Sequence, residues 1–394
     1  MQKNLFQLNV TANWGSTGKI AEGIGLAAMR RGWESTIAYG RYMNSSQSNL
    51  IRVGNKFDVY VHYARNRFFD GEGLGSSKAT RKLIRQIDEL SPDILHLHNI
   101  HDHWLNYPLL FDYLATIDTP VVWTFHDCWA FTGGCAHFEN ADCYKWKDMA
   151  CAACPLKHKS AKKNIATRFE AFSKIGCRFH IVTVSNWLAK YASESIFGQM
   201  GANIAVINNG IDINNVFHPG DNKDMMILGV SNVWPEYKGL RDFVKLREIL
   251  PDDICITLVG LNKKQIESLP QRIIGISRTN SANELADLYR RAAVFVNPTY
   301  NDSFPTVNLE ALACGTPVIT YRTGGSPEAI DKQTGIVVEK GDFAGLADAI
   351  MNIINNPEQY SSHNCRERAV YHFNKDIQFN KYIDLYEKIL NKTK

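Results

Sequence analysis

Residues 293–326 read AVFVNPTYNDSFPTVNLEALACGTPVITYRTGGS, and this stretch predicts the fold of the chain. The apolar run at 293–296 predicts a buried parallel strand. A turn with Pro305 follows, residues 306–314 carry apolar groups at helical spacing, and Gly315 ends the helix. A second apolar run begins at once, at 317–320. Strand, loop, helix and strand in this order form the repeating unit of a doubly wound α/β sheet.

Two carboxylates flank the start of this predicted helix, Asp302 before it and Glu310 inside it, with seven residues between them. Free N–H groups and the positive end of the dipole make a helix N-terminus suitable for phosphate oxygens. Carboxylates accept hydrogen bonds from hydroxyls. Either carboxylate alone is more typical of an ordinary strand–helix unit, but the whole stretch favours a site for a nucleotide sugar.

The segment NDSFPTVNLEALACGTPVI, residues 301–319, resembles the E-x7-E signature of retaining glycosyltransferases of family 4, with Asp302 in place of the first Glu. The resemblance implies the GT-B fold, two doubly wound Rossmann-like α/β domains facing each other across a cleft. It also implies that Asp302 contacts the donor sugar and that Glu310 holds the nucleotide ribose. The rest of the implied donor site is the loop and helix start at Ser303, Phe304, Pro305, Thr306 and Val307.

The length of 394 residues predicts two to three domains at one per ~150 residues. We assign 1–206 to an N-terminal acceptor domain with a Cys-rich insert at 128–155, 207–374 to a donor domain, and 375–394 to a helix that returns to the first domain. No uncharged apolar stretch reaches the ~20 residues that span a membrane. Because the N-terminus leads into a strand pattern rather than a signal peptide, we expect a cytoplasmic protein.

The charge of the chain is uneven. Residues 1–200 hold 23 Lys and Arg against 17 Asp and Glu, a balance of +6, whereas the whole chain carries +4. This mild excess suits an anionic acceptor or an anionic membrane, and it is too small to indicate nucleic acid. The basic stretch 156–178 is either an amphipathic helix that touches a membrane or, as we prefer, a solvated helix packed on the core. The stretch 41–77 has clusters of Gly, Ser and Asn, and we expect it to be irregular.

Polar residues gather after the predicted strands of the first half. A Gly-rich loop with Gly15 and Gly18 follows the first strand and resembles the family loop that faces the donor phosphates or the acceptor. His98 and Asn99 lie in HLHNIHDHW, a segment similar to one in surface-polysaccharide transferases, which implies acceptor contacts. A metal site of His96, His98, His101 and His103 is the less favoured alternative.

His126 follows the predicted strand 120–125, in WTFHDCWAFTGGC. Position alone is equally typical of a satisfied core histidine. The resemblance to family 4 implies that His126 contacts the donor sugar near the reacting carbon. In the second half, Lys238 precedes a predicted helix and is placed to meet a diphosphate, whereas Ser231 and Asn232 occupy the region where the family normally has an Arg.

Four cysteines follow the spacing C-x7-C-x7-C-x2-C, namely Cys135, Cys143, Cys151 and Cys154. Cysteines in a cytosolic chain indicate thiols or metal rather than disulfides. A structural zinc is compatible with four thiolates that end in CxxC, although the x7 spacing is not that of a standard finger. Zinc and four thiols without metal both remain open.

Together these features predict an enzyme, a retaining glycosyltransferase of surface-polysaccharide synthesis. It would move a sugar from a nucleotide-diphosphate sugar to a glycan or lipid-linked glycan in the cytoplasm, at the inner face of the cell membrane for a lipid-linked acceptor. The resemblance implies that catalysis needs no cofactor or divalent metal. The alternatives are a catalytically weak nucleotide-sugar-binding partner subunit and a GT-B nucleotide-sugar epimerase.

Overall fold

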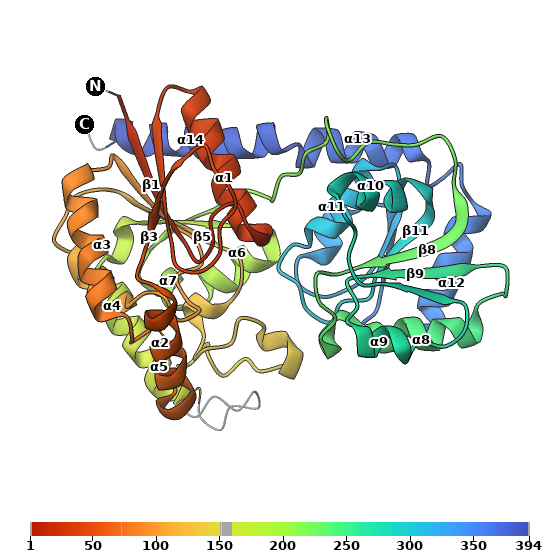
Figure 1. Cartoon of the computed structure of the whole chain (residues 1–394), viewed down its shortest axis with the longest axis horizontal. Coiled ribbons are helices and arrows are strands. Elements are labelled where there is room, and N and C mark those ends of the chain that lie inside the picture. Colours follow the sequence, from red (N-terminus) through yellow and green to blue (C-terminus); the bar gives the residue numbers. More distant parts are fainter. Residues whose placement is uncertain (1, 72, 150, 152–159, 393–394) are drawn as a thin grey trace. The chain divides into compact units, whose positions relative to one another are not determined.

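The computed structural model describes residues 2–71, 73–149, 151 and 160–392. The chain divides into two compact units, which are described separately (Figure 1). Unit 1 comprises Met1–Asn208 and Asp376–Lys394, and unit 2 comprises Asn209–Lys375. Each unit contains one parallel sheet with helices around it, which confirms the predicted α/β class with two Rossmann-like domains. None of the helices in the described parts of the chain combines the length and hydropathy that crossing a membrane requires.

Unit 1 has a seven-stranded sheet in the order β3-β2-β1-β4-β5-β6-β7, with every pair of neighbours parallel. Its strands are β1 (Asn4–Asn9), β2 (Glu34–Tyr39), β3 (Asn49–Arg52), β4 (Ile94–Leu97), β5 (Val121–Phe125), β6 (Phe179–Thr183) and β7 (Asn203–Val206). Its helices are α1 (Gly15–Arg30), α2 (Lys56–Phe69), α3 (Ser77–Leu90), α4 (Tyr107–Leu114), α5 (Ala161–Ser173), α6 (Asn186–Ser193), α7 (Ile196–Gln199) and α14 (Lys375–Lys392).

Unit 2 has a six-stranded parallel sheet in the order β10-β9-β8-β11-β12-β13. Its strands are β8 (Asp224–Val230), β9 (Cys255–Val259), β10 (Ile273–Ile276), β11 (Ala292–Asn297), β12 (Val318–Tyr321) and β13 (Gly335–Val338). Its helices are α8 (Leu240–Ile249), α9 (Lys263–Glu267), α10 (Ala282–Arg291), α11 (Thr306–Ala313), α12 (Phe343–Asn355) and α13 (Ser362–Phe373), with the single-turn η4 (Glu236–Lys238) before α8.

The strand order reverses once in each sheet, between β1 and β4 in unit 1 and between β8 and β11 in unit 2. Open parallel sheets bind ligands beyond the carboxyl ends of the strands at such a switch point. We therefore expect a ligand-binding site at the loops that follow β1, β4, β8 and β11.

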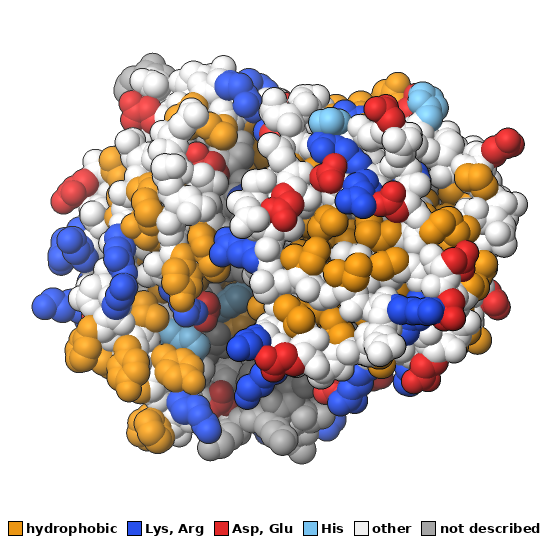
Figure 2. All heavy atoms as spheres, turned by 45° about the vertical axis from the view of Figure 1, so that its right-hand side comes forward, with side chains coloured by type: hydrophobic (Ala, Val, Ile, Leu, Met, Phe, Trp, Pro, Cys, Tyr) orange, Lys and Arg blue, Asp and Glu red, His pale blue; other side chains and the backbone are white. Residues whose placement is uncertain are grey.

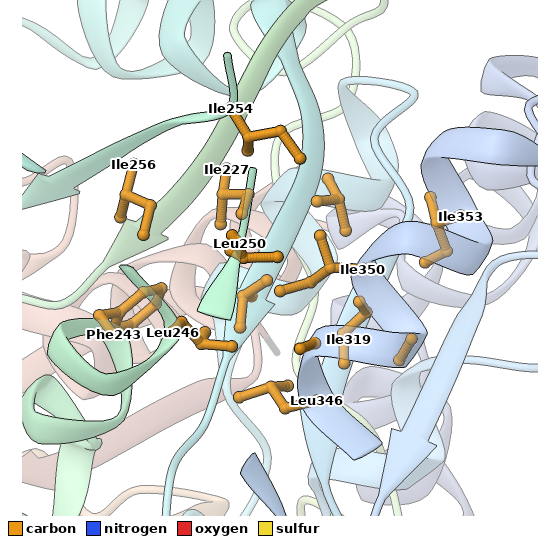
Figure 3. Packing of buried hydrophobic residues seen from close by; sticks show 14 of the residues in the cluster. Ile227, Phe243, Leu246, Leu250, Ile254, Ile256, Ile319, Leu346, Ile350 and Ile353 are labelled. Atoms are coloured by element: carbon orange, nitrogen blue, oxygen red, sulfur yellow. The ribbon is translucent and has the colours of Figure 1, made fainter. Parts of the chain in front are cut away.

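The core of unit 2 lies between its sheet and the helices α8 and α12 (Figure 3). Phe243 and Leu246 from α8 and Ile350 from α12 pack with the strand residues Ile227 and Ile319, and all five are fully buried. Burying one such side chain stabilises a fold by about 1.5–3 kcal/mol. This packing fixes the strand ends from which the candidate site is built.

The last helix, α14, completes the core of unit 1, as the sequence predicts. Its buried face consists of Phe379, Tyr382, Ile383, Tyr386 and Ile389. The Tyr386 hydroxyl lies 2.6 Å from His96 Nδ1, and the Thr124 hydroxyl donates to the Tyr382 hydroxyl at 3.3 Å. The final residues of the chain thus pack against strands β4 and β5 of its first half.

The stretch 41–77 is not irregular, and this prediction was wrong. It contains β3 and the fourteen-residue helix α2. Asn55 caps α2 by accepting hydrogen bonds from the amides of Phe57 and Asp58, while the Asp58 carboxylate accepts from the Asn55 amide. This capping box is a local start signal that the Gly, Ser and Asn clusters around it obscured.

The basic stretch 156–178 contains α5, whose residues Ile165, Arg168 and Phe172 are buried. Residues 156–159 lie outside the described part of the chain. Arg168 donates to the Thr132 carbonyl, and its guanidinium lies 3.9 Å from the ring centre of Trp129. The preferred interpretation, a helix packed on the core, is therefore confirmed for α5.

Candidate functional site

The first loop of unit 1 is shorter than the sequence predicts. We expected a loop through Gly18, but α1 begins at Gly15, so both predicted glycines lie in its first turn. A Cβ on Gly18 would lie 2.7 Å from Thr11 Oγ1, which explains why glycine is needed where the loop folds back on the helix. No described side chain caps this helix end. Its amides are therefore suited to an anion.

Gln7, His98 and His126 form a row across the carboxyl ends of β1, β4 and β5, which we call the histidine row. The Gln7 amide nitrogen donates to the Ala21 carbonyl at 2.9 Å, which turns the Gln7 oxygen toward His98. His98 Nε2 lies 3.1 Å from this oxygen, and His98 Nδ1 lies 3.1 Å from His126 Nε2.

These contacts assign the protons of the histidine row. An amide oxygen only accepts, so His98 Nε2 carries a proton and His98 Nδ1 must accept from His126 Nε2. In a neutral imidazole only one nitrogen is protonated, which leaves His126 Nδ1 as an acceptor. Burial lowers the pKa of His98 well below its usual value, and it lowers the pKa of His126 to about 4. Both rings are therefore neutral at pH 7, and His126 offers an acceptor suited to a hydroxyl.

The remaining polar residues at these strand ends are also held in place. The Asn99 amide donates to Asn9 Oδ1 at 3.2 Å. His101 Nε2 lies 3.0 Å from Asp127, and Asp127 also accepts from the Trp129 amide at 2.8 Å. Burial alone would raise the pKa of Asp127, but His101 and the Trp129 amide outweigh it and lower this pKa to about 2. One small cavity is lined by His98, Asn99, His101, His126 and Asp127.

The predicted acceptor residues His98 and Asn99 and the predicted donor residue His126 thus lie together. Gln7, Asn9 and Asp127 were not predicted, since a single polar residue in or after a strand gives no sequence signal. Among the residues that the structure describes, no group of three or more His, Cys, Asp or Glu side chains could hold a metal ion. This argues against the less favoured metal site at the four histidines, all of which are described.

In unit 2 the loops after β8 and β11 meet at the switch point. The Lys238 ammonium contacts Asp302 Oδ2 at 2.6 Å, and both side chains are 22% exposed. Asp302 Oδ1 accepts from the Phe304 amide at 3.2 Å. An ammonium has three N–H donors, so two remain for other oxygens when Asp302 takes one. Residues that are 64 positions apart in the sequence therefore form one charged pair.

The pair lies at the entry to α11. Helix α11 starts at Thr306 after Pro305, and no described side chain caps it. The backbone of Phe304 is held in place by Asn209, whose Nδ2 donates to the Phe304 carbonyl at 3.1 Å. The Ser303 hydroxyl is buried, with the residue 4% exposed, and it has no hydrogen-bond partner among the described residues. A buried polar group without a partner costs free energy unless a ligand or water satisfies it.

A buried polar network, absent from our predictions, holds this loop. Asn297 Nδ2 donates to Asn308 Oδ1 at 2.8 Å, and Asn308 Nδ2 donates to Ser326 Oγ at 3.1 Å. Ser326 in turn lies 2.6 Å from the Thr320 hydroxyl. A Cβ on Gly324, whose φ is +54°, would lie 1.9 Å from the Asp302 carbonyl. The network joins β11, α11 and β12, and so fixes where the helix begins.

Glu310 lies half-buried on α11 beyond Val307. The buried Tyr289 hydroxyl donates to Glu310 Oε2 at 3.1 Å. Ser231 and Asn232 follow β8 as predicted, but the Ser231 hydroxyl donates to the Val233 carbonyl at 2.5 Å and Asn232 is exposed.

Cys135, Cys143 and Cys151 line one cavity with an apolar lining that includes Phe138 and Trp146. Cys154 lies outside the described residues. Without Cys154 the described cysteines do not form a group that could hold a metal ion, so the four-cysteine zinc site is not tested and stays a prediction.

Comparison with known proteins shows which family the chain resembles in sequence and in fold. Residues 21–215 match a family described as Glycosyltransferase Family 4, and residues 224–356 match one described as Glycosyl transferases group 1. WcaC of Escherichia coli (strain K12), whose description assigns it to colanic acid biosynthesis, is 23% identical over 87% of this chain and 89% of its own length.

Two solved structures are similar in fold. Sucrose-phosphate synthase from Thermosynechococcus elongatus has a TM-score of 0.73 at 18% identity, over 99% of this chain and 100% of the other. Anabaena Alr3699/HepE in complex with UDP-glucose has a TM-score of 0.62 at 13% identity, over 97% of this chain and 99% of the other. At these identities the likeness establishes the fold, GT-B. The chain is a glycosyltransferase, in which a Glycosyltransferase Family 4 domain is followed by a Glycosyl transferases group 1 domain.

Proposed function

We propose that this glycosyltransferase moves a sugar from a nucleoside-diphosphate sugar to a hydroxyl of a glycan or lipid-linked glycan in surface-polysaccharide synthesis, with retention at the anomeric carbon. The reaction would take place in the cytoplasm, at the inner face of the cell membrane when the acceptor is lipid-linked. The HepE structure is a complex with UDP-glucose, and the description of WcaC names colanic acid biosynthesis, which supports a nucleotide-sugar donor and a polysaccharide product.

The observation that carries the proposal is the Lys238–Asp302 pair at the uncapped start of α11. A departing diphosphate gains negative charge, and fixed donors aimed at that charge lower the barrier. Lys238 offers two N–H donors beyond the one that Asp302 takes, and the amides of Thr306 and Val307 open the helix. The Ser303 hydroxyl lies in the loop that leads to this helix and supplies one more donor for a phosphate oxygen.

The other contacts follow from the hydrogen-bond character of each group. Glu310, oriented by Tyr289, would accept from the ribose hydroxyls. His126, neutral and with Nδ1 as an acceptor, would accept from a hydroxyl of the donor sugar. The acceptor hydroxyl attacks the anomeric carbon as the bond to the phosphate oxygen breaks, and its proton passes to the departing phosphate. Asp302 already accepts a hydrogen bond from Lys238, so in this scheme it holds a sugar hydroxyl only while it keeps that contact. Asp302 is therefore above all a positioning residue for Lys238.

A thermal-shift screen of nucleotide sugars, followed by assay of nucleoside-diphosphate release, tests the proposal. A ligand at 100 times its Kd adds about 2.7 kcal/mol of stability, so a true donor should raise the melting temperature clearly. Slow hydrolysis of the same compound would support transfer. Stabilisation by none of the nucleotide sugars would refute it.

One observation favours a second candidate, a catalytically weak nucleotide-sugar-binding subunit. Lys238 and Asp302 neutralise each other, and neither Ser231 nor Asn232 supplies the cation that the family resemblance implies nearby. This candidate predicts that a nucleotide sugar binds but that no nucleoside diphosphate is released.

We also propose a structural role for zinc at the Cys-rich insert, with Cys135, Cys143 and Cys151 among its ligands. Cysteines bind zinc as deprotonated thiolates. A bound zinc would hold the three sulfurs together around a cavity that is otherwise apolar. Metal analysis of protein purified without chelator should find one zinc per chain, and its absence would end this proposal.

A further inference from the structure

Helix α2 of unit 1 carries its large apolar side chains on the outside. Phe57, Tyr60, Val61, Phe68 and Phe69 are 71%, 67%, 48%, 73% and 76% exposed, whereas only His62 of the fourteen residues is buried. Soluble proteins rarely expose a contiguous patch of this kind without a partner for it. Figure 2 shows hydrophobic side chains gathered at the lower left, at the height that α2 has in Figure 1, with Lys and Arg side chains beside them.

The spacing of these residues makes a stripe. Phe57, Tyr60, Val61, Ala64 and Phe68 stand at positions i, i+3, i+4, i+7 and i+11, which share one face of a helix. In a helix that packs on a core this stripe points inward. In α2 the stripe lies opposite the buried His62 and points to solvent. The apolar face of this amphipathic helix is therefore its exposed face.

Polar contacts, rather than an apolar face, attach α2 to unit 1. His62 Nε2 accepts from the amides of Gly73 and Gly75 at 3.1 Å each, and His62 Nδ1 lies 3.0 Å from the Ser76 hydroxyl. Asn66 Nδ2 lies 2.9 Å from His103 Nε2. The apolar stripe is thus not needed to hold the helix in place.

Positive charge surrounds the stripe. Lys56, Arg65 and Arg67 of α2 are exposed on its two sides, and Asp58 is the only acidic residue within the helix. The neighbouring α3 adds an exposed basic face of Lys78, Arg81, Lys82 and Arg85. The starts of the two helices are adjacent, since a Cβ on Gly54 would lie 2.9 Å from Asp58 and 3.2 Å from Ala79.

We propose that α2 is a membrane-docking surface that lies in the interface of an anionic lipid bilayer, with Phe57, Val61 and Phe68 inserted and the basic residues of α2 and α3 on the headgroups. Apolar residues on one face with Lys and Arg beside them are the features of a helix that lies in a membrane surface. Tyr60 and Tyr63 suit the headgroup level, where aromatic rings with a polar tip are enriched. A protein partner with a neutral surface would match the apolar stripe equally well, but it would not explain why so many cations border it.

Flotation of the full-length protein with vesicles tests this surface without any sugar donor, so the result is independent of the proposed transfer reaction. Wild-type protein should bind vesicles that contain phosphatidylglycerol, and bind phosphatidylcholine vesicles at least about tenfold less. The double variant Phe57→Ser/Phe68→Ser should lose binding to both. Arg65→Gln/Arg67→Gln should lose only the preference for the anionic lipid.

Tyr371→Ser, at a 68% exposed aromatic residue of unit 2, is the matched control and should bind like the wild type. A second variant guards against misfolding: Tyr60→Trp should keep the fold and show a blue-shifted fluorescence when anionic vesicles are added. Equal binding of the wild type and the Phe57→Ser/Phe68→Ser variant would overturn the proposal. So would a wild-type dimer in solution that this variant dissociates, because the stripe would then bind a second copy of the chain.

Discussion

The two switch points of the molecule differ in the charge of the side chains that surround them. In unit 1, neutral rings form a row in which each proton is assigned by the next acceptor, from Gln7 to His98 to His126. In unit 2, a charged pair, Lys238 and Asp302, stands partly exposed beside a helix start. A neutral acceptor recognises hydroxyls, which do not change charge in the reaction, whereas fixed charges suit a diphosphate that does. In the proposed reaction, the groups of unit 1 therefore suit sugar hydroxyls and those of unit 2 suit the leaving diphosphate.

The largest effect should come from removing the cation of unit 2. Lys238→Ala deletes a donor that is aimed at the developing charge, so kcat should fall by about 10²–10³-fold while folding stability changes little. Lys264→Ala, at an exposed position of the same unit, is the control. Steady-state kinetics of nucleoside-diphosphate release make the measurement. Normal turnover of Lys238→Ala would remove this residue from the reaction.

The neutrality of the histidine row should be visible in the dependence of stability on pH. An unfolded histidine binds its proton near pH 6.5, whereas His126 in the fold does so only near pH 4. Between these values the unfolded state binds more protons, so the free energy of unfolding falls as the pH falls through this window. At about 1.4 kcal/mol per pKa unit, His126 accounts for up to about 3 kcal/mol.

His126→Asn should therefore flatten the melting temperature between about pH 6.5 and 4. His363→Asn, whose side chain is 77% exposed on α13, should not. The residual slope in His126→Asn is expected to come from His96 and His98, since burial also lowers the pKa of each well below its usual value. A wild-type slope in His126→Asn would show that this ring is protonated in the fold.

The nucleotide contact of unit 2 should show a smaller loss. Glu310→Gln removes the charge of the carboxylate that we propose accepts hydrogen bonds from the ribose hydroxyls, and affinity for the nucleoside diphosphate should weaken by about 1.5–3 kcal/mol in calorimetry. Tyr289→Phe removes only the hydroxyl that orients the Glu310 carboxylate, so the loss of affinity should be smaller than in Glu310→Gln. Unchanged affinity in Glu310→Gln would place the ribose elsewhere.

The smallest expected effect belongs to Gln7. Nitrogen-15 shifts should report His98 and His126 protonated at Nε2 in the wild type, and Gln7→Leu should release this preference by deleting the acceptor. Donor affinity should then fall by about 1 kcal/mol, the net worth of one hydrogen bond. Gln199→Leu, at an exposed site of unit 1, serves as the control. Protonation of His126 at Nδ1 in the wild type would reverse its assigned role.

The sequence predicts those parts of the site whose signal is local. The stretch around Asp302 and Glu310 combines turn, helix start and strand within 34 residues, so both the fold and the position of α11 follow from it. The pairing of Lys238 with Asp302 could not be predicted, because the two loops come together only once β8 and β11 pair as neighbours in the folded sheet. The role of Gln7 could not be predicted, because the sequence does not show which side chain lies next to a single glutamine in a strand. Helix α2 was missed because the Gly, Ser and Asn clusters of 41–77 outweighed the helical spacing of its apolar residues.

Because α14 completes unit 1, the two units become able to fold at different stages of synthesis. Unit 2 is continuous in the sequence from Asn209 to Lys375, so every residue it needs has left the ribosome before α14 is finished. Unit 1 lacks Tyr382 and Tyr386 until then, and the face of β4 and β5 that they cover stays open. The second half of the chain can therefore complete its fold first, while one face of the sheet in the first half is still uncovered. An interrupted chain that ends before α14 would carry that exposed face and be a substrate for chaperones and proteases.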